Sequence, residues 1–281
     1  MKFFFIALLL LVPLTSTANV FGKDTRKKWD GWPSIPHPLD RVGALKHPSG
    51  NRCTASYIGK NLILTAAHCI MKEDKDELIK GDYLFEHIRL PNGEYWDSRT
   101  IKRFHFIELK QIENGGLSAA ENHWAILEMS SPIHPDSRTF GMRYPGDSKY
   151  DVYHDSNYNL SIVGFSPLFN DDSLELTFSE SGCEIRQHLR DGKLALHTCD
   201  SGPRDSGAPL YKCLEGEYGE WSKCYIIAIH VAAYSEDGIH FPRYLMEHAN
   251  LAVTMRSFKD VWYYLMAGGP KPDDLISVDN D

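Results

Sequence analysis

Apolar residues in this chain fall mostly in short runs that Gly, Pro, Asn and Asp separate from one another. Short apolar or alternating runs between turn residues are typical of β-strands, whereas a helix requires a longer segment with a period near 3.6 residues. We therefore predict an all-β fold. Its expected strands cover residues 41–46, 52–58, 62–65, 85–90, 100–107, 124–129, 160–165, 174–185, 194–198, 208–213, 225–234 and 251–255.

The pattern changes close to the C-terminus. Four large apolar residues recur there on one helical face: Phe258, Val261, Trp262 and Leu265. Ser257 is a candidate N-cap, and Gly268-Gly269-Pro270 would end the helix. We predict a helix over residues 257–267 and an acidic tail over 269–281, disordered from residue 271.

The N-terminus has the pattern of a secretory signal. Lys2 precedes an apolar run over residues 3–14, and Ser16-Thr17-Ala18 supplies the small residues that a signal peptidase recognises. Residues 1–18 are therefore predicted to be a signal peptide, and the protein to be secreted, either extracellular or periplasmic. No later stretch approaches the roughly 18 apolar residues of a membrane span, so no membrane association is expected.

Charge limits the choice of partners. The formal net charge is −8, spread along the chain, whereas a nucleic-acid-binding protein needs a basic face. We therefore exclude nucleic acid. We also expect a monomer. What remains after the signal peptide is long enough for one large β-unit or for two small ones that share a cleft.

Six cysteines in an exported chain predict three disulfides. Six cysteines allow about 15 connectivities, and proximity favours Cys53–Cys69, Cys183–Cys199 and Cys213–Cys224. Neither a Cys-x-x-Cys nor a His-Glu-x-x-His motif occurs, and the 13 histidines are scattered. We therefore predict no metal and no cofactor.

Two stretches carry candidate chemistry. Residues 62–69 form an apolar strand that runs into small residues and then His68 beside Cys69, so a disulfide there would hold the ring as a general base. The triplet Asp-Ser-Gly occurs twice, at residues 200–202 and 205–207. On pattern alone, Ser201 and Ser206 would both be turn residues.

The stretch Thr65-Ala66-Ala67-His68-Cys69 resembles the active-site histidine motif of the chymotrypsin-like serine peptidases. The resemblance extends over residues 41–267 and includes the strand Trp124-Ala125-Ile126-Leu127-Glu128. It is closest to the secreted branch with the glutamyl endopeptidases, whose serine loop reads Cys-Asp-Thr and then Gly-x-Ser-Gly-x-Pro. This implies a peptidase domain over 41–268, with two six-stranded antiparallel β-barrels at about 41–135 and 136–256 and the C-terminal helix.

The same resemblance gives these residues roles. Ser206 becomes the nucleophile, His68 the general base and Ser201 a residue of the specificity pocket. The third member of the triad is normally an Asp, but the matching position is His123. Three interpretations remain open: a Ser-His-His triad, as in the herpesvirus peptidases; a shifted alignment with Asn122 or Glu121 in the role; or loss of the acid in a pseudoprotease.

Two further positions bear on activity. Arg204 stands where the family has the glycine whose N–H, with that of Ser206, forms the oxyanion hole. His230 matches the histidine that binds the substrate carboxylate in glutamyl endopeptidases, so it would pair with Ser201 to favour Glu or Asp at the cleaved position. A buried histidine bonded to backbone is the alternative.

Residues 19–40 are predicted to be an N-terminal or pro-segment. Arg41-Val42-Gly43 superficially resembles a zymogen junction but reads as the first strand. The cluster Arg26-Lys27-Lys28 is the better processing site, since cleavage there would free an amino terminus that could pair with Asp205.

Two hypotheses follow. The first is a secreted serine endopeptidase that hydrolyses protein or peptide substrates through an acyl-enzyme, with a preference for acidic residues. The second is a catalytically impaired pseudoprotease that acts as a secreted protein-binding module.

Overall fold

The structure is a computed structural model. It describes residues 20–21, 24–29, 38–72, 75–89, 95–107, 120–133, 139–142, 160–166, 176–213, 224–233 and 249–280. The predicted signal peptide lies outside the described residues and stays a prediction, as does the boundary between the two barrels near residue 135.

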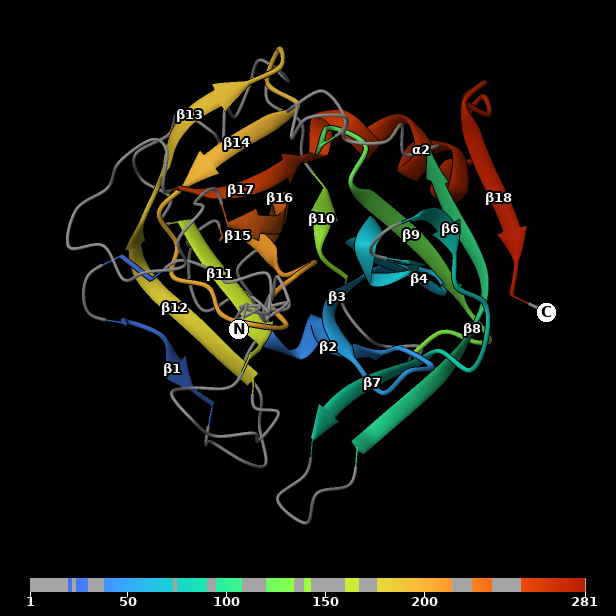
Figure 1. Cartoon of the computed structure of the whole chain (residues 1–281), viewed down its shortest axis with the longest axis horizontal. Helices are drawn as coiled ribbons and strands as arrows, with labels where there is room; N and C mark the ends of the chain where they lie inside the picture. Colours follow the sequence, from blue (N-terminus) through green and yellow to red (C-terminus); the bar gives the residue numbers. More distant parts are fainter. Residues whose placement is uncertain are drawn as a thin grey trace, which may run out of the picture.

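Six strands of the N-terminal half form a closed barrel (Figure 1). They are β2 Val42–Lys46, β3 Arg52–Gly59, β4 Leu62–Ala66, β7 Leu84–Arg89, β8 Tyr95–Ile107 and β9 Trp124–Met129. The order is β8-β7-β2-β3-β4-β9, and β9 pairs back with β8 to complete the ring. Its interior is apolar, with Leu45, Ile63, Phe85, Phe104 and Leu127 almost completely buried.

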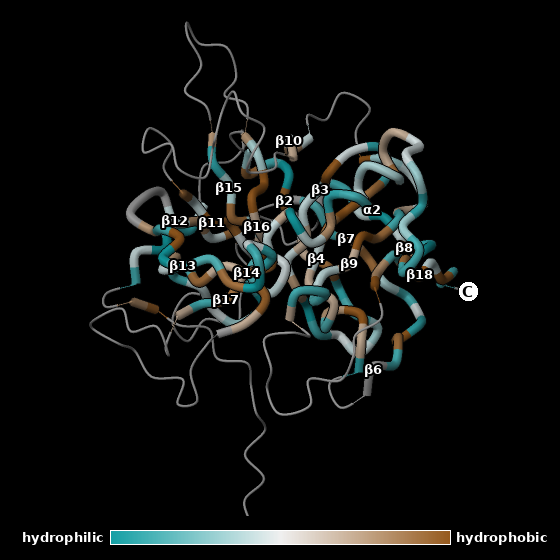
Figure 2. Tube along the Cα trace, turned by 90° about the horizontal axis from the view of Figure 1, so that it is seen from above, coloured by the Kyte–Doolittle hydropathy of each residue, from teal (hydrophilic) through white to brown (hydrophobic). Residues whose placement is uncertain are grey.

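The second sheet has nine strands, and seven of them, all in the C-terminal half, form its main part. They are β11 Leu160–Phe165, β12 Leu176–Cys183, β13 Ile185–Leu189, β14 Leu194–His197, β15 Pro209–Cys213, β16 Cys224–Ala233 and β17 Asn250–Thr254. The order is β12-β11-β15-β16-β17-β14-β13. Because only Glu184 separates β12 from β13, the two ends of this sheet are joined through the chain. Figure 2 shows hydrophobic positions along the strands of both halves.

The prediction of an all-β fold with a six-stranded antiparallel barrel and a C-terminal helix is thus confirmed, and the second sheet is consistent with the second predicted barrel. The single strand expected over 174–185 is divided, since β13 begins a new pairing with β14 after Glu184. Short elements escaped prediction: β1 Lys27–Lys28 pairs with β12, β10 Gly141–Met142 pairs with β16, and β5 Met71–Lys72 pairs with β6 Lys75–Leu78.

The helix α2 spans Met255–Ala267, so it begins earlier than predicted. Its N-cap is Thr254, whose hydroxyl accepts a hydrogen bond from the N–H of Arg256 at 3.3 Å. Ser257 is not the cap, because its hydroxyl donates to the carbonyl of Lys193. Gly268 ends the helix with a left-handed φ of 72°, as its lack of a Cβ allows. No helix among the described residues is long and apolar enough to cross a membrane.

The prediction of a disordered tail is wrong for its central part. Residues Leu275–Asp279 form β18, which pairs with the second half of β8 at the edge of the first barrel (Figure 1). Asn280 follows and donates hydrogen bonds to the carbonyls of Gly81 and Ile101, at 2.8 and 2.9 Å. Leu275, Ser277 and Asp279 thus belong to a regular sheet edge, despite the acidic composition of the segment.

All three predicted disulfides are present: Cys53–Cys69, Cys183–Cys199 and Cys213–Cys224.

Candidate active site

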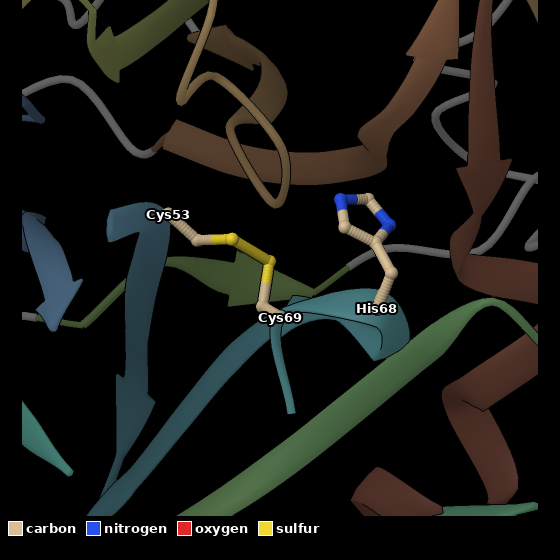
Figure 3. Close-up of side chains that lie close together, drawn as sticks. All are labelled: Cys53, His68 and Cys69. Atoms are coloured by element: carbon tan, nitrogen blue, oxygen red, sulfur yellow. A yellow bond between two sulfur atoms is a disulfide. The ribbon is translucent and has the colours of Figure 1, made fainter. Parts of the chain in front are cut away.

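His68 lies on a short 3-10 turn, Ala67–Cys69, that follows β4. Cys69 is bonded to Cys53 on β3, and Figure 3 shows the disulfide and the ring of His68 projecting from the same turn. The N–H of Ala67 donates to the carbonyl of His123 at 3.2 Å. The backbone of His68 is therefore fixed both to β3 and to the loop before β9.

The ring of His123 lies directly beside that of His68. Nδ1 of His68 and Nε2 of His123 are 2.7 Å apart, and the ring planes are tilted by 34°. The alternative residue Glu121 faces elsewhere: its carboxylate lies 3.6 Å from Arg190 and 3.4 Å from Lys193. Of the candidates for the third position, the structure brings His123 to His68.

Both rings are neutral at pH 7. Burial lowers the pKa of His68 to about 4. Burial, together with the charge of His68, lowers the pKa of His123 to about 3. One nitrogen of the pair must therefore donate and the other accept. When Nδ1 of His68 donates, its Nε2 carries no proton and is free to act as a general base.

The serine loop between β14 and β15 is held by Thr54 of β3. The N–H of Thr54 donates to the carbonyl of Ser206 at 2.9 Å, and its hydroxyl donates to the carbonyl of Arg204 at 2.9 Å. Gly207 has a φ of 86°, and a Cβ there would overlap the carbonyl of Thr54 and the hydroxyl of Thr65. Glycine is thus required directly after Ser206 for two reasons, conformation and space.

Arg204 adopts the backbone conformation that glycine usually supplies. Its φ is 77°, in the left-handed region that costs a side-chain-bearing residue about 1–2 kcal/mol. Within the described part of the chain, the N–H groups of Arg204 and Ser206 donate no hydrogen bond, and the hydroxyl of Ser206 makes none to His68. No described residue thus occupies the two N–H groups, and the bond between Ser206 and His68 is not preformed.

Ser201 and His230 are both buried, with 0 and 2 % of their surface exposed. Nδ1 of His230 lies 3.2 Å from Nε2 of His197, and the hydroxyl of Ser201 has no hydrogen-bond partner among the described residues. Burial, and next the charge of His68, lowers the pKa of His230 to about 3. The expected alternative, a histidine bonded to backbone, is not found for this ring.

Sequence analysis did not single out His197. It ends β14, whereas His230 lies on β16, and β17 pairs with both strands. No local pattern links two residues that meet across a third strand, so only the fold brings them together.

The ligand atoms of Cys53, His68 and Cys69 lie within 4.8 Å of one another. The two sulfurs are joined in a disulfide, so neither offers the thiolate that a metal requires.

Comparisons with known proteins concern the sequence and the fold of the chain. A sequence model of the Trypsin family matches residues 30–156. Among solved structures, the chain is similar to a Glu endopeptidase in complex with MPD. That likeness has a TM-score of 0.62 and 18 % identity, and it covers 88 % of this chain and 99 % of the other. No curated protein matches the chain in sequence. Structural likeness at this identity concerns the fold, and the Trypsin match concerns the sequence. Together they support the resemblance to the trypsin-like serine peptidases, in sequence over residues 30–156 and in fold over most of the chain.

Proposed function

We propose that the protein is an active, exported serine endopeptidase that cleaves protein or peptide substrates through an acyl-enzyme at Ser206. The observation that carries this proposal is the 2.7 Å hydrogen bond between His68 and His123. It orients the ring of His68, which is one role of the third residue in a serine-peptidase triad, and in the tautomer with Nδ1–H it leaves Nε2 of His68 free as the base.

The chemistry divides among few groups. Nε2 of His68 takes the proton of the Ser206 hydroxyl as its oxygen attacks the substrate carbonyl, and later gives that proton to the leaving amine. Nδ1–H of His68 donates to His123 throughout. The N–H groups of Arg204 and Ser206 stabilise the negative oxygen that forms, as oxyanion donors. Water then attacks the acyl group by the same route.

Ser201 and His230 support a preference for acidic side chains at the cleaved position. A neutral His230 that accepts from His197 through Nδ1 carries its proton on Nε2, where it can donate to a carboxylate. The unpartnered hydroxyl of Ser201 supplies a second donor. A hydrogen bond to a charged group contributes about 1.5–3 kcal/mol, so Glu should be preferred to Gln by about tenfold or more.

Export is part of the proposal. Three disulfides are typical of proteins that fold in an oxidising compartment. We expect the enzyme to act as a monomer, with its substrate as its partner.

The test is labelling of the purified protein with a fluorophosphonate probe, with Ser206→Ala as the control. Labelling of wild type alone would support the nucleophile. A peptide series that differs only at the cleaved residue, Glu against Gln, would then test the pocket, with His230→Gln expected to abolish the difference. A folded wild type that does not label would refute the proposed activity.

Two observations favour a second candidate function. The neutral ring of His123 stabilises a protonated His68 less well than a carboxylate would, and Ser206 makes no hydrogen bond to His68. A protein silenced in this way would be a secreted binding module. It would fold with its three disulfides, fail to label and bind a protein without cleaving it.

A further inference from the structure

The described residues of the N-terminal segment, Val20, Phe21 and Asp24 to Trp29, lie against the second sheet. Lys27 and Lys28 form β1, which pairs with Phe178 and Thr177 of β12, and the N–H of Trp29 donates to the carbonyl of Leu176 at 2.9 Å. Figure 1 shows β1 beside β12, at the edge of that sheet. This segment was predicted to be a pro-segment, yet it is paired into the fold.

Asp200, in the serine loop, binds this segment through both carboxylate oxygens. Oδ1 accepts the N–H of Phe21 at 2.9 Å, and Oδ2 accepts the N–H and the hydroxyl of Thr25 at 2.8 and 2.6 Å. Only 4 % of Asp200 is exposed, so these donors replace the water that it lost. The residue that precedes Ser201 is therefore satisfied by the N-terminal segment.

The guanidinium of Arg26 lies close to Asp205, the residue that precedes Ser206. Nη1 lies 2.5 Å from the hydroxyl of Ser166 and 3.4 Å from Oδ2 of Asp205, while Nε and Nη2 bind Asp24. Burial acts to lower the pKa of Arg26, but the bond to Asp24 and the nearby carboxylates raise it overall. The buried guanidinium stays charged.

Two glycines leave room for this ion pair. A Cβ on Gly202 would overlap Nη1 of Arg26, and a Cβ on Gly164 would overlap Oδ1 of Asp205. The guanidinium of Arg26 and the carboxylate of Asp205 therefore fit because Gly202 and Gly164 have no side chains. Such fitting distinguishes a built site from a chance surface contact.

Asp205 connects the ion pair to the catalytic loop. Its Oδ2 accepts the N–H of Gly202 at 2.7 Å, and its own backbone lies between Arg204 and Ser206. Burial raises the pKa of Asp205 to about 6, while Arg26 and the N–H of Gly202 act in the opposite direction. Without Arg26, a buried carboxylate would lose its nearest positive charge.

We propose that Arg26 is a positioning residue that holds Asp205, and through it the N–H groups of Arg204 and Ser206, so that the uncleaved chain already has its competent serine loop. This inference rests on the proposed function. Arg26 occupies the place that a new amino terminus would take after cleavage at Arg26-Lys27-Lys28. Cleavage after Arg26 would separate it from β1, and cleavage after Lys28 would separate both from Trp29, so either cut would weaken the loop rather than assemble it.

The experiment compares four full-length proteins in fluorophosphonate labelling, with intact mass measured for each labelled species. Lys27→Gln/Lys28→Gln removes the adjacent basic residues but keeps Arg26, and should label at the wild-type rate with residues 20–28 retained. Arg26→Met should slow labelling by roughly 10²-fold, about the loss of one oxyanion donor. Arg26→Lys keeps the charge without the planar fork and should restore part of the rate.

A pH profile separates positioning from simple structural damage. Asp205 faces Arg26, Ser166 and the N–H of Gly202, with Asp24 and Asp200 close to the same guanidinium. In Arg26→Met the acid limb of the labelling profile should move to higher pH, because Asp205 ionises less readily. An Arg26→Met variant with the wild-type rate and profile would overturn the inference, as would labelling confined to chains cleaved after residue 26.

If wild type does not label, the proposed function fails, and thermal unfolding decides the inference alone. In Arg26→Met, ionisation of Asp205 at higher pH would place a buried negative charge without its counter-ion. The stability deficit of Arg26→Met relative to wild type should therefore grow as the pH rises from 5 to 8. A deficit that stays constant over this range would show that Arg26 does not control Asp205.

Discussion

Replacing His123 with Asp should accelerate the reaction of Ser206. In wild type, His68 donates to a neutral ring at 2.7 Å, and burial lowers the pKa of His68 to about 4. A base of such low pKa is a weak acceptor for the proton of Ser206. An aspartate would put a negative charge where the protonated form of His68 needs it.

The expected size follows from Coulomb's law. Opposite charges about 4 Å apart, at an effective dielectric constant of about 20, attract by about 4 kcal/mol. That corresponds to about three pKa units, enough to raise the pKa of His68 from about 4 to about 7. If most of this energy appears in the transition state, His123→Asp should label about 10²–10³ times faster than wild type.

The assay is the second-order rate constant for fluorophosphonate labelling between pH 4 and 9. Ser206→Ala in each background gives the blank, and His123→Asn is the matched control, since it has the shape of Asp without its charge. Only the Asp variant should gain rate. Equal rates for the Asp and Asn variants would refute the electrostatic reasoning, and an unchanged Asp variant would show that His123 does not limit the base.

Three further predictions concern the scaffold. Arg204→Gly should label within about threefold of wild type, because the backbone is already left-handed; a large gain would mean that the arginine side chain obstructs the hole. Loss of solvation lowers the pKa of four histidines to about 3–4: His68, His105, His123 and His230. Since unfolding restores values near 6.5, urea titrations should show stability falling as the pH drops from 6.5 to 4, by up to about 1.4 kcal/mol per pH unit per net proton. Asp205, with a raised pKa of about 6, offsets about one of these protons, and a flat profile would contradict the assignment. Cys53→Ala/Cys69→Ala opens a link between residues 16 apart and should cost about 3 kcal/mol in the same titrations, with slower labelling because the turn of His68 loses its anchor.

The strands were predictable because each buried strand appears in the sequence as a short local run of apolar residues. The runs at 62–65 and 124–129 became β4 and β9, whose interior residues Ile63 and Leu127 pair in the first barrel. The disulfides were predictable for a similar reason, since each joins cysteines that are close in the chain. A strand that forms only because it pairs with the edge of a barrel could not be predicted from local sequence. The segment Leu275–Asp279 is a short apolar run inside an acidic tail, and it is a strand because β8 offers it an unpaired edge.

Residues of the candidate site could be proposed from the sequence only where one local motif contains them. His68 and Ser206 stand in specific stretches, and His123 was found from its position before β9. Arg26 and His197 act through partners 179 and 33 residues away, Asp205 and His230, so no spacing pattern marks them. A sequence does not show which backbone N–H groups will bind a given side chain. The N–H of Phe21, which donates to Asp200, is an example.

The charges around His68 also bear on why an acidic substrate would suit this site. Asp200 and Asp205 bind the N-terminal segment, and His123 is neutral, so none of these three residues is a free counter-ion for His68. His230 lies near enough for the charge of His68 to lower its pKa. A substrate carboxylate bound by His230 would therefore bring negative charge close to His68 and partly supply what His123 lacks. We expect the preference for Glu over Gln to be larger in wild type than in His123→Asp, where a carboxylate already supports the base. Peptide cleavage rates for both proteins would test this coupling, and a Glu preference equal in the two would refute it.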